Sequence, residues 1–170
     1  LSGELKKDDS VAIAPSGQQT SILAIQQESQ HRQSASAETA LSLELTYSVS
    51  IQPGDIIVAA DIRPEFADQF EAKIDWLDEQ DLLPGRTYSF RAVGGSGEAT
   101  ISKLKYRIEA DSRQQIAATT LGAQQSGVGN IALTRPVVFD SFSICRATGQ
   151  FELLDRTTGV PVARGEIRHG

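Results

Sequence analysis

The chain has 170 residues, and 39% of them are hydrophobic, a proportion that suffices for one domain of ordinary size or for two small β-barrels. A chain that is disordered throughout is therefore excluded. The formal net charge is −6, from 16 Lys and Arg against 22 Asp and Glu, which disfavours a protein that binds nucleic acid through bulk positive charge. A single cysteine allows no internal disulfide, and no apolar run is long enough to cross a membrane, so we expect a cytoplasmic protein without a membrane-spanning segment.

The sequence contains no methionine, and it starts with Leu1-Ser-Gly3. This start is typical of a segment cut from a longer protein. We therefore expect any chemistry of that protein to be carried out by a part outside these residues.

The first 60 residues predict short strands separated by turns. The turn Pro15-Ser-Gly17 predicts a hairpin between the first two strands, and the alternation in Leu41–Leu45 predicts a half-buried strand. The polar stretch Gln26–Glu38 predicts a loop, and it contains His31 without a second His or Cys nearby to complete a zinc site. The strands are expected at Val11–Ile13, Ser21–Ile25, Leu41–Leu45 and Ile56–Ala60.

A domain boundary is expected near residue 61, and residues 61–170 also predict mostly strands. In the run from Phe70 to Trp76, every second residue is apolar, and Ile101 is out of phase with Leu104, which predicts a bulge near Ser102. Only 112–121 predicts one or two helical turns. The strands are expected at Phe70–Trp76, Thr87–Val93, Glu98–Ile108, Ile131–Leu133, Val137–Phe139, Phe151–Leu154 and Val160–Ile167. The pattern predicts two all-β domains, residues 1–60 and 61–170, built as sandwiches or barrels.

No motif in the sequence predicts a catalytic, cofactor-binding or metal-binding residue. The glycine-rich run Gly94–Gly97 lies between two predicted strands and lacks the Lys of a phosphate-binding loop, so a hairpin turn is favoured. The carboxylates Asp78, Glu79 and Asp81 lie in a polar connection. Cys145 has no partner base in the sequence around it, which favours a buried apolar side chain over a catalytic thiol.

Two surfaces are candidates for contact with a partner. Lys103, Lys105 and Arg107 form a row of period two, expected on the face opposite Leu104 and Tyr106. Such a row fits a protein or nucleic-acid contact, and it equally fits an ordinary solvated sheet face. The second candidate is the edge from Trp76 to Leu83.

Several runs resemble known families. Val11-Ala-Ile-Ala-Pro-Ser-Gly17 and Ile51-Gln-Pro-Gly-Asp-Ile-Ile-Val58 resemble the second domain of the translation-factor GTPase superfamily. Ala67–Trp76, Leu82-Leu-Pro-Gly-Arg-Thr-Tyr88 and Ala147-Thr-Gly-Gln-Phe-Glu-Leu-Leu-Asp-Arg156 resemble the GTP-binding large subunit of bacterial sulfate adenylyltransferase. The resemblance covers nearly the whole chain.

The resemblance implies an all-β fold of two consecutive β-barrels like the second and third domains of elongation factor Tu, with residues 1–60 short of a first strand. It implies a preceding GTPase domain that holds GTP and Mg, so that no cofactor binds to these residues. It also implies a catalytic small subunit as partner, which makes adenylyl sulfate and pyrophosphate from ATP and sulfate, and in some members a fused adenylylsulfate kinase domain. The barrels are then expected to dock the small subunit and to relay the state of the GTPase.

Two positions depart from the family pattern. Gln124 stands where the family has Asn, and Arg164 stands where it has a small residue. These departures weaken the expectation that this copy keeps every contact between domains and with the partner subunit. The alternative is a translation elongation factor whose barrels hold aminoacyl-tRNA, and the basic row on Lys103, Lys105 and Arg107 is its best support. Against it, both predicted domains are acidic overall.

Overall fold

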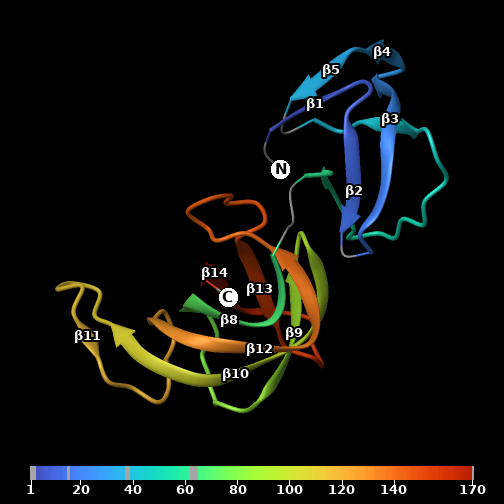
Figure 1. Cartoon of the computed structure of the whole chain (residues 1–170). Coiled ribbons are helices and arrows are strands. Elements are labelled where there is room, and N and C mark those ends of the chain that lie inside the picture. Colours follow the sequence, from blue (N-terminus) through green and yellow to red (C-terminus); the bar gives the residue numbers. More distant parts are fainter. Residues whose placement is uncertain (1–2, 15, 37–38, 62–64, 170) are drawn as a thin grey trace. The chain divides into compact units, whose positions relative to one another are not determined.

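The computed structural model describes residues 3–14, 16–36, 39–61 and 65–169. The described residues form strands and no helix, and the chain divides into two compact units, Leu1–Pro64 and Glu65–Gly170 (Figure 1). This division lies a few residues beyond the boundary expected near residue 61. Pro15 and residues 62–64, on which the expected turn and boundary partly rest, lie outside the described residues.

The first unit is an antiparallel half-barrel with the strand order β4-β3-β2-β7, in which β6 also pairs with β3 and β1 pairs with β5. The expected hairpin is confirmed, because β2 and β3 pair in antiparallel register from Ser10 opposite Ser21. Its strands are β1 (Glu4–Lys6), β2 (Ser10–Ala14), β3 (Gln18–Gln27), β4 (Gln30–Arg32), β5 (Ser34–Ser36), β6 (Ser42–Leu45) and β7 (Ile56–Ala59).

The prediction of a loop at Gln26–Glu38 is wrong for most of this stretch, because β4 and β5 lie within it. Gln27 pairs with Gln30, and the two residues between them, Glu28 and Ser29, both have positive φ, at 48° and 65°. Two successive residues of this kind form the tight hairpin turn that suits the twist of the strands. Backbone pairing with β3 and β1 holds these strands in place. All side chains of β4 are polar and exposed, and in β5 only Ala35 is apolar and partly buried, so hydrophobic periodicity gives little signal for either strand.

The second unit is a closed barrel of six antiparallel strands in the order β10-β12-β8-β14-β13-β9, closed by the pairing of β9 with β10 (Figure 1). A short seventh strand, β11, extends the sheet beside β10. The strands are β8 (Glu65–Trp76), β9 (Thr87–Ala92), β10 (Gly95–Ile108), β11 (Gln115–Ile116), β12 (Ser126–Phe139), β13 (Gln150–Leu154) and β14 (Pro161–His169).

The barrel core is built on the inward face of β8, as its alternation predicts. The inward residues of this strand are at most 3% exposed, and they are Phe70, Ala72, Ile74 and Trp76. The Phe70 ring centroid lies 5.4 Å from that of Phe139 and 5.7 Å from that of Phe151. Burial of one such ring contributes about 1.5–3 kcal/mol to folding. Gly165 on β14 lies against the Phe151 ring, where an added methyl group would overlap ring atoms.

The helical turns expected in 112–121 are wrong. Gln115 and Ile116 instead form β11, which pairs with the end of β10. Leu121 is fully buried, and its carbonyl oxygen accepts a hydrogen bond of 2.8 Å from the backbone N–H of Leu82. At Leu121 the backbone is thus hydrogen-bonded to another segment rather than within a helix. A helix here would have no continuous apolar stripe to bury against the core, so packing would not stabilise it.

The bulge expected near Ser102 is confirmed by a shift in register between Ile101 and Lys103 against β12. A second shift, between Leu104 and Tyr106, had no sequence signal. On β14, Arg164 points away from the core, with 70% of its side chain exposed, and its Nε lies 3.6 Å from a Glu152 carboxylate oxygen. The bulk of Arg164 therefore does not enter the barrel interior.

Gln124 lies in a turn with φ of +62°, a conformation that favours Asn among non-glycine residues. Its backbone N–H donates to the Trp76 carbonyl over 3.0 Å, so the conformation is held by the barrel. We expect Gln124→Asn to raise the free energy of unfolding by about 0.5 kcal/mol, because Asn adopts this conformation at lower cost. Urea denaturation measures the change.

Gln125→Asn is the matched control for that experiment. The Gln125 side-chain oxygen accepts a 2.9 Å hydrogen bond from the Gly122 backbone N–H, which the shorter amide would lose. The control should be no more stable than the original chain. A Gln124→Asn protein as stable as the control, or less stable, would contradict the expectation.

Candidate functional site

The basic row does not form one continuous surface. Lys105 lies at the second bulge of β10, and its ammonium group contacts the carboxylate of Glu71. Arg107 pairs with Glu109, with 3.3 Å between Nη2 and Oε2. Within the described part of the chain, Lys103 has no carboxylate at ion-pair distance. Two of the three basic residues of the row are therefore paired with the barrel's own acidic residues.

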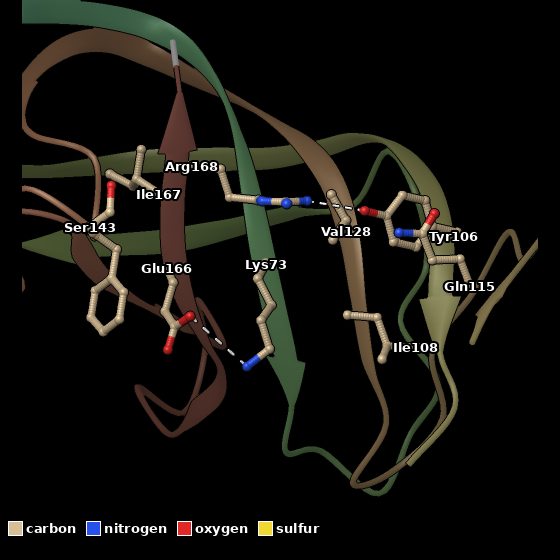
Figure 2. A pocket seen from close by; sticks show the side chains of 10 residues that line it. Lys73, Tyr106, Ile108, Gln115, Val128, Ser143, Glu166, Ile167 and Arg168 are labelled. Atoms are coloured by element: carbon tan, nitrogen blue, oxygen red, sulfur yellow. Dashed lines mark hydrogen bonds and ion pairs between the residues drawn. The ribbon is translucent and has the colours of Figure 1, made fainter. Parts of the chain in front are cut away.

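Tyr106 lies on the outer face of the barrel. The prediction that it shares the inward face of Leu104, on the other side of the strand from Lys105, is wrong. The bulge at Lys105 shifts the residues after it by one place, so that Leu104 stays in the core while Tyr106 turns outward. The Tyr106 hydroxyl accepts a 3.0 Å hydrogen bond from Nη1 of Arg168 on β14, as the dashed line in Figure 2 shows. The bulge thereby brings an aromatic residue onto the same surface as the charged side chains.

Glu71 is the centre of a charged cluster on this outer face. It follows the buried Phe70 on β8, and only 11% of its side chain is exposed. Besides Lys105, its Oε1 lies 3.4 Å from Nη1 of Arg168 and 3.8 Å from Nε2 of His169. Side chains from β10 and β14 thus meet on one carboxylate of β8.

The surroundings of Glu71 favour its charged form. The hydrogen bond from Lys105 lowers the pKa of the Glu71 carboxyl below its ordinary value, and partial burial opposes this effect. The positive charges of Lys105, His169 and Arg168 lower the pKa further. The cluster is therefore strongest when Glu71 is ionised.

The edge from Trp76 to Leu83 is buried at one end and exposed at the other. Trp76 is 2% exposed, its ring packs edge-on against Tyr88 at 5.7 Å, and its indole N–H donates to the Gln80 carbonyl over 2.7 Å. Trp76 is thus a core residue and cannot contact a partner without opening the barrel. Leu83 remains a surface candidate because it is 56% exposed.

An ion pair lies at the same end of the barrel as Leu83. Nη2 of Arg86 is 2.9 Å from Oδ2 of Asp155, and the guanidinium lies 5.6 Å from the centroid of the Tyr88 ring. Backbone N–H groups of Thr158 and Thr157, each 2.9 Å from Oδ1, lower the pKa of Asp155, and Arg86 acts in the same direction. This end therefore combines an exposed apolar side chain with a fixed charge pair.

The other residues considered in the sequence serve packing or chain turns. Cys145 is 9% exposed, in the connection between β12 and β13, in keeping with a buried apolar side chain. β9 and β10 do form a hairpin, but its turn is Val93 and Gly94, while Gly95–Gly97 are the first residues of β10. Gly94 packs directly against the carbonyl of Val138. In the ranges that the structure covers, no three His, Cys, Asp or Glu residues are grouped so that they could hold a metal ion. No helix there is long and apolar enough to span a membrane.

We expect Glu71→Gln to lower the free energy of unfolding by about 1 kcal/mol at pH 7. This value lies between the usual contribution of a hydrogen bond to a charged group and that of an exposed ion pair. The pKa of Glu71 is lowered in the folded state, so its contribution is present above the unfolded pKa and is lost as the pH falls through the folded value. Denaturation at pH 7 and below pH ~4 should therefore show a difference that shrinks in acid.

The control for that variant is Glu98→Gln. Glu98 pairs with Arg156 at 2.6 Å, but both side chains are about half exposed, at 42% and 54%. It should change stability by less than about 0.5 kcal/mol. A loss at Glu71 that is equally large in acid would show that packing, rather than charge, holds the cluster together.

Comparison with known proteins identifies relatives over the whole chain. The model of the family described as GTP-eEF1A C-terminal domain-like matches residues 69–168. The bifunctional enzyme NodQ of Rhizobium sp. strain N33 is 38% identical, over 99% of this chain and 26% of that protein. The bifunctional enzyme CysN/CysC of Xylella fastidiosa is 31% identical, over 99% of this chain and 27% of that protein. Sulfate adenylyltransferase subunit 1 of Aeromonas salmonicida is 30% identical, over 99% of this chain and 36% of that protein.

Solved structures share the fold. sup35 complexed with GDP has a TM-score of 0.87 at 20% identity, over 98% of this chain and 41% of that chain. Translation elongation factor SelB from Methanococcus maripaludis, in its apo form, has a TM-score of 0.77 at 17% identity, over 99% and 37% of the two chains. These likenesses confirm the all-β fold of elongation-factor type. The chain belongs to the GTP-eEF1A C-terminal domain-like family, and its whole length is similar to a segment of NodQ, CysN/CysC and sulfate adenylyltransferase subunit 1.

Proposed function

We propose that this chain forms the two β-barrel domains of the GTPase subunit of sulfate adenylyltransferase. The observation that carries the proposal is similarity over 99% of the chain to NodQ and to sulfate adenylyltransferase subunit 1, at 38% and 30% identity. The parent protein would couple GTP hydrolysis to the synthesis of adenylyl sulfate from ATP and sulfate. Because that reaction consumes ATP and GTP, its place is the cytoplasm.

The relatives support further domains in the parent. The chain spans 36% of sulfate adenylyltransferase subunit 1 but only 26% of NodQ and 27% of CysN/CysC, so the bifunctional relatives are the longer proteins. This difference favours a fused adenylylsulfate kinase domain in proteins of the NodQ type. We place GTP and Mg in a GTPase domain of the parent rather than in the barrels.

The barrels would dock the catalytic small subunit and relay the state of the GTPase. Such a relay requires that the small subunit bind the GTP-bound and GDP-bound states with different affinities. A partner with equal affinity for both states cannot shift the equilibrium between them. Leu83 is a candidate for docking, since it is exposed beside the fixed Arg86–Asp155 pair.

The native protein, purified with its small subunit, tests the proposal. We expect GTP to raise the amount of adenylyl sulfate formed from ATP and sulfate by about tenfold, which corresponds to 1.4 kcal/mol of coupling. A non-hydrolysable GTP analogue is the control, and it should bind without sustaining this increase. Adenylyl sulfate formation that does not respond to GTP would overturn the proposal.

The second candidate function is a translation factor that holds aminoacyl-tRNA, and the basic residues on β10 favour it. The structure weakens this support, since Lys105 is paired with Glu71 and Arg107 with Glu109. Lys103 would be left as the main positive contact of the row. A single such contact supplies little of the affinity that phosphate binding requires.

A gel-shift experiment with aminoacyl-tRNA separates the two functions. We expect no complex whose affinity falls steeply with salt. A tRNA-binding protein with several phosphate contacts would lose roughly 10³-fold in affinity between 50 and 200 mM salt. A salt-sensitive complex that Lys103→Gln weakens, and that Arg113→Gln leaves unchanged, would favour the translation factor.

A further inference from the structure

The two edge strands of the sheet in the first unit differ in character. β4 forms one edge, and all three of its residues, Gln30-His-Arg32, are polar and exposed, which suits an edge that faces solvent. β7 forms the other edge, and its residues Ile56-Ile-Val-Ala59 are all apolar. Edges that face solvent usually carry charged residues or proline, which keep other strands from adding to them. β7 has neither, so its composition is that of a strand with a neighbour on both sides.

The backbone groups of β7 that point away from β2 have no partner among the described residues. The Ala60 N–H donates to the Ser10 carbonyl over 3.0 Å, so every second residue before Ala60 also bonds to β2. In an antiparallel pair the residues in between direct their N–H and C=O groups to the other side. These residues are Ile57 and Ala59, and no described strand pairs with β7 on that side. The edge is therefore open for backbone pairing.

The core of the first unit also loses its cover toward this edge. Val11 and Ile13 of β2 are 2% and 0% exposed. The residues opposite them on β7 are Ala59 and Ile57, whose side chains lie on the same face of the sheet. Ile57 is only partly buried, and Ala59 is exposed. The core-facing side of β7 thus lacks the neighbour that β2 has on each side.

We propose that an extended segment of the parent protein, from outside residues 1–170, pairs with the open edge of β7 and covers the core beside it. This inference rests on the proposed function, which makes these residues part of a longer protein. The segment would bond to the N–H and C=O groups of Ile57 and Ala59. Every second side chain of the segment would be apolar, because these side chains would extend the core face of β7.

The small size of the edge favours a segment of the same polypeptide over a separate chain. Only two residues offer free backbone groups, and a separate chain would have to offset its lost translational and rotational freedom with these few contacts. A tethered segment avoids most of that cost, because its effective concentration is on the order of millimolar. The apolar composition of β7 agrees with this, since permanent contacts are more apolar than transient ones.

Hydrogen exchange, resolved to single amides by mass spectrometry, tests the proposal. Val58, whose N–H bonds to β2, is the internal reference. In the chain of residues 1–170, we expect the amides of Ile57 and Ala59 to exchange at least about tenfold faster than that of Val58. In the purified parent protein without its small subunit, all three should exchange at similarly slow rates.

Three results would overturn the proposal. The first is fast exchange of Ile57 and Ala59 in the parent protein. The second is protection that appears only when the small subunit is added, which would assign the edge to that subunit. The third is protection in the parent that is lost on dilution, which would assign the edge to a second copy.

Substitutions at Ala59 provide the matched control. Ala59→Pro removes the N–H that points to the open edge and leaves the bonds to β2, whereas Ala59→Ser keeps this N–H. In the parent protein, Ile57 should exchange at least about fivefold faster in the Pro variant than in the Ser variant. In the chain of residues 1–170, Ile57 should exchange equally fast in both variants. The same ratio in both proteins would show strain from proline rather than a lost bond, and it would overturn the proposal.

The result is independent of the response to GTP. A parent protein that forms more adenylyl sulfate with GTP, but exchanges Ile57 and Ala59 rapidly, would overturn this inference alone. A parent protein that protects both amides, but does not respond to GTP, would overturn the proposed function alone. If Ala59→Pro prevents folding of the parent, the exchange of the unaltered proteins decides the outcome.

Discussion

The alternation of side chains along β8 is the constraint on which both faces of the second unit depend. Its inward residues, from Phe70 to Trp76, form the aromatic and aliphatic core that closes the barrel. Its outward residues are Glu71, Lys73 and Asp75, and each of them makes an ion pair on the outer face. A shift of this strand by one residue would bury three charges and expose the core, so one register determines both the packing and the charged surface.

The bulges of β10 modify what β8 establishes. A regular β10 would turn Tyr106 toward the core and keep the basic residues in one outward row. Because the register shifts after Leu104, Tyr106 joins Arg168 on the outside, and Lys105 reaches Glu71. The surface that results is a mixture of an aromatic ring and paired charges. Its basic side chains are paired with carboxylates, so it is not the unbalanced positive surface that attracts a polyanion.

Features that depend on local apolar periodicity could be predicted from the sequence, such as the buried face of β8, the hairpin before β3 and the bulge near Ser102. The strands β4 and β5 could not, because they are held mainly by backbone pairing with β3 and β1, and Ala35 is the one apolar side chain among their six residues. The Glu71 cluster could not either, since its members come from strands far apart in the chain and the bulge at Lys105 has no apolar residue out of phase to reveal it. Trp76 could have been excluded as a contact residue, because it shares the face of Phe70 and Ile74.

The closure of the barrel has a mechanical consequence. Because β9 pairs with both β13 and β10, each of the six barrel strands is bonded to a neighbour on either side. No barrel strand can be displaced without breaking two ladders, so none of the six offers a free edge from which the barrel could open locally.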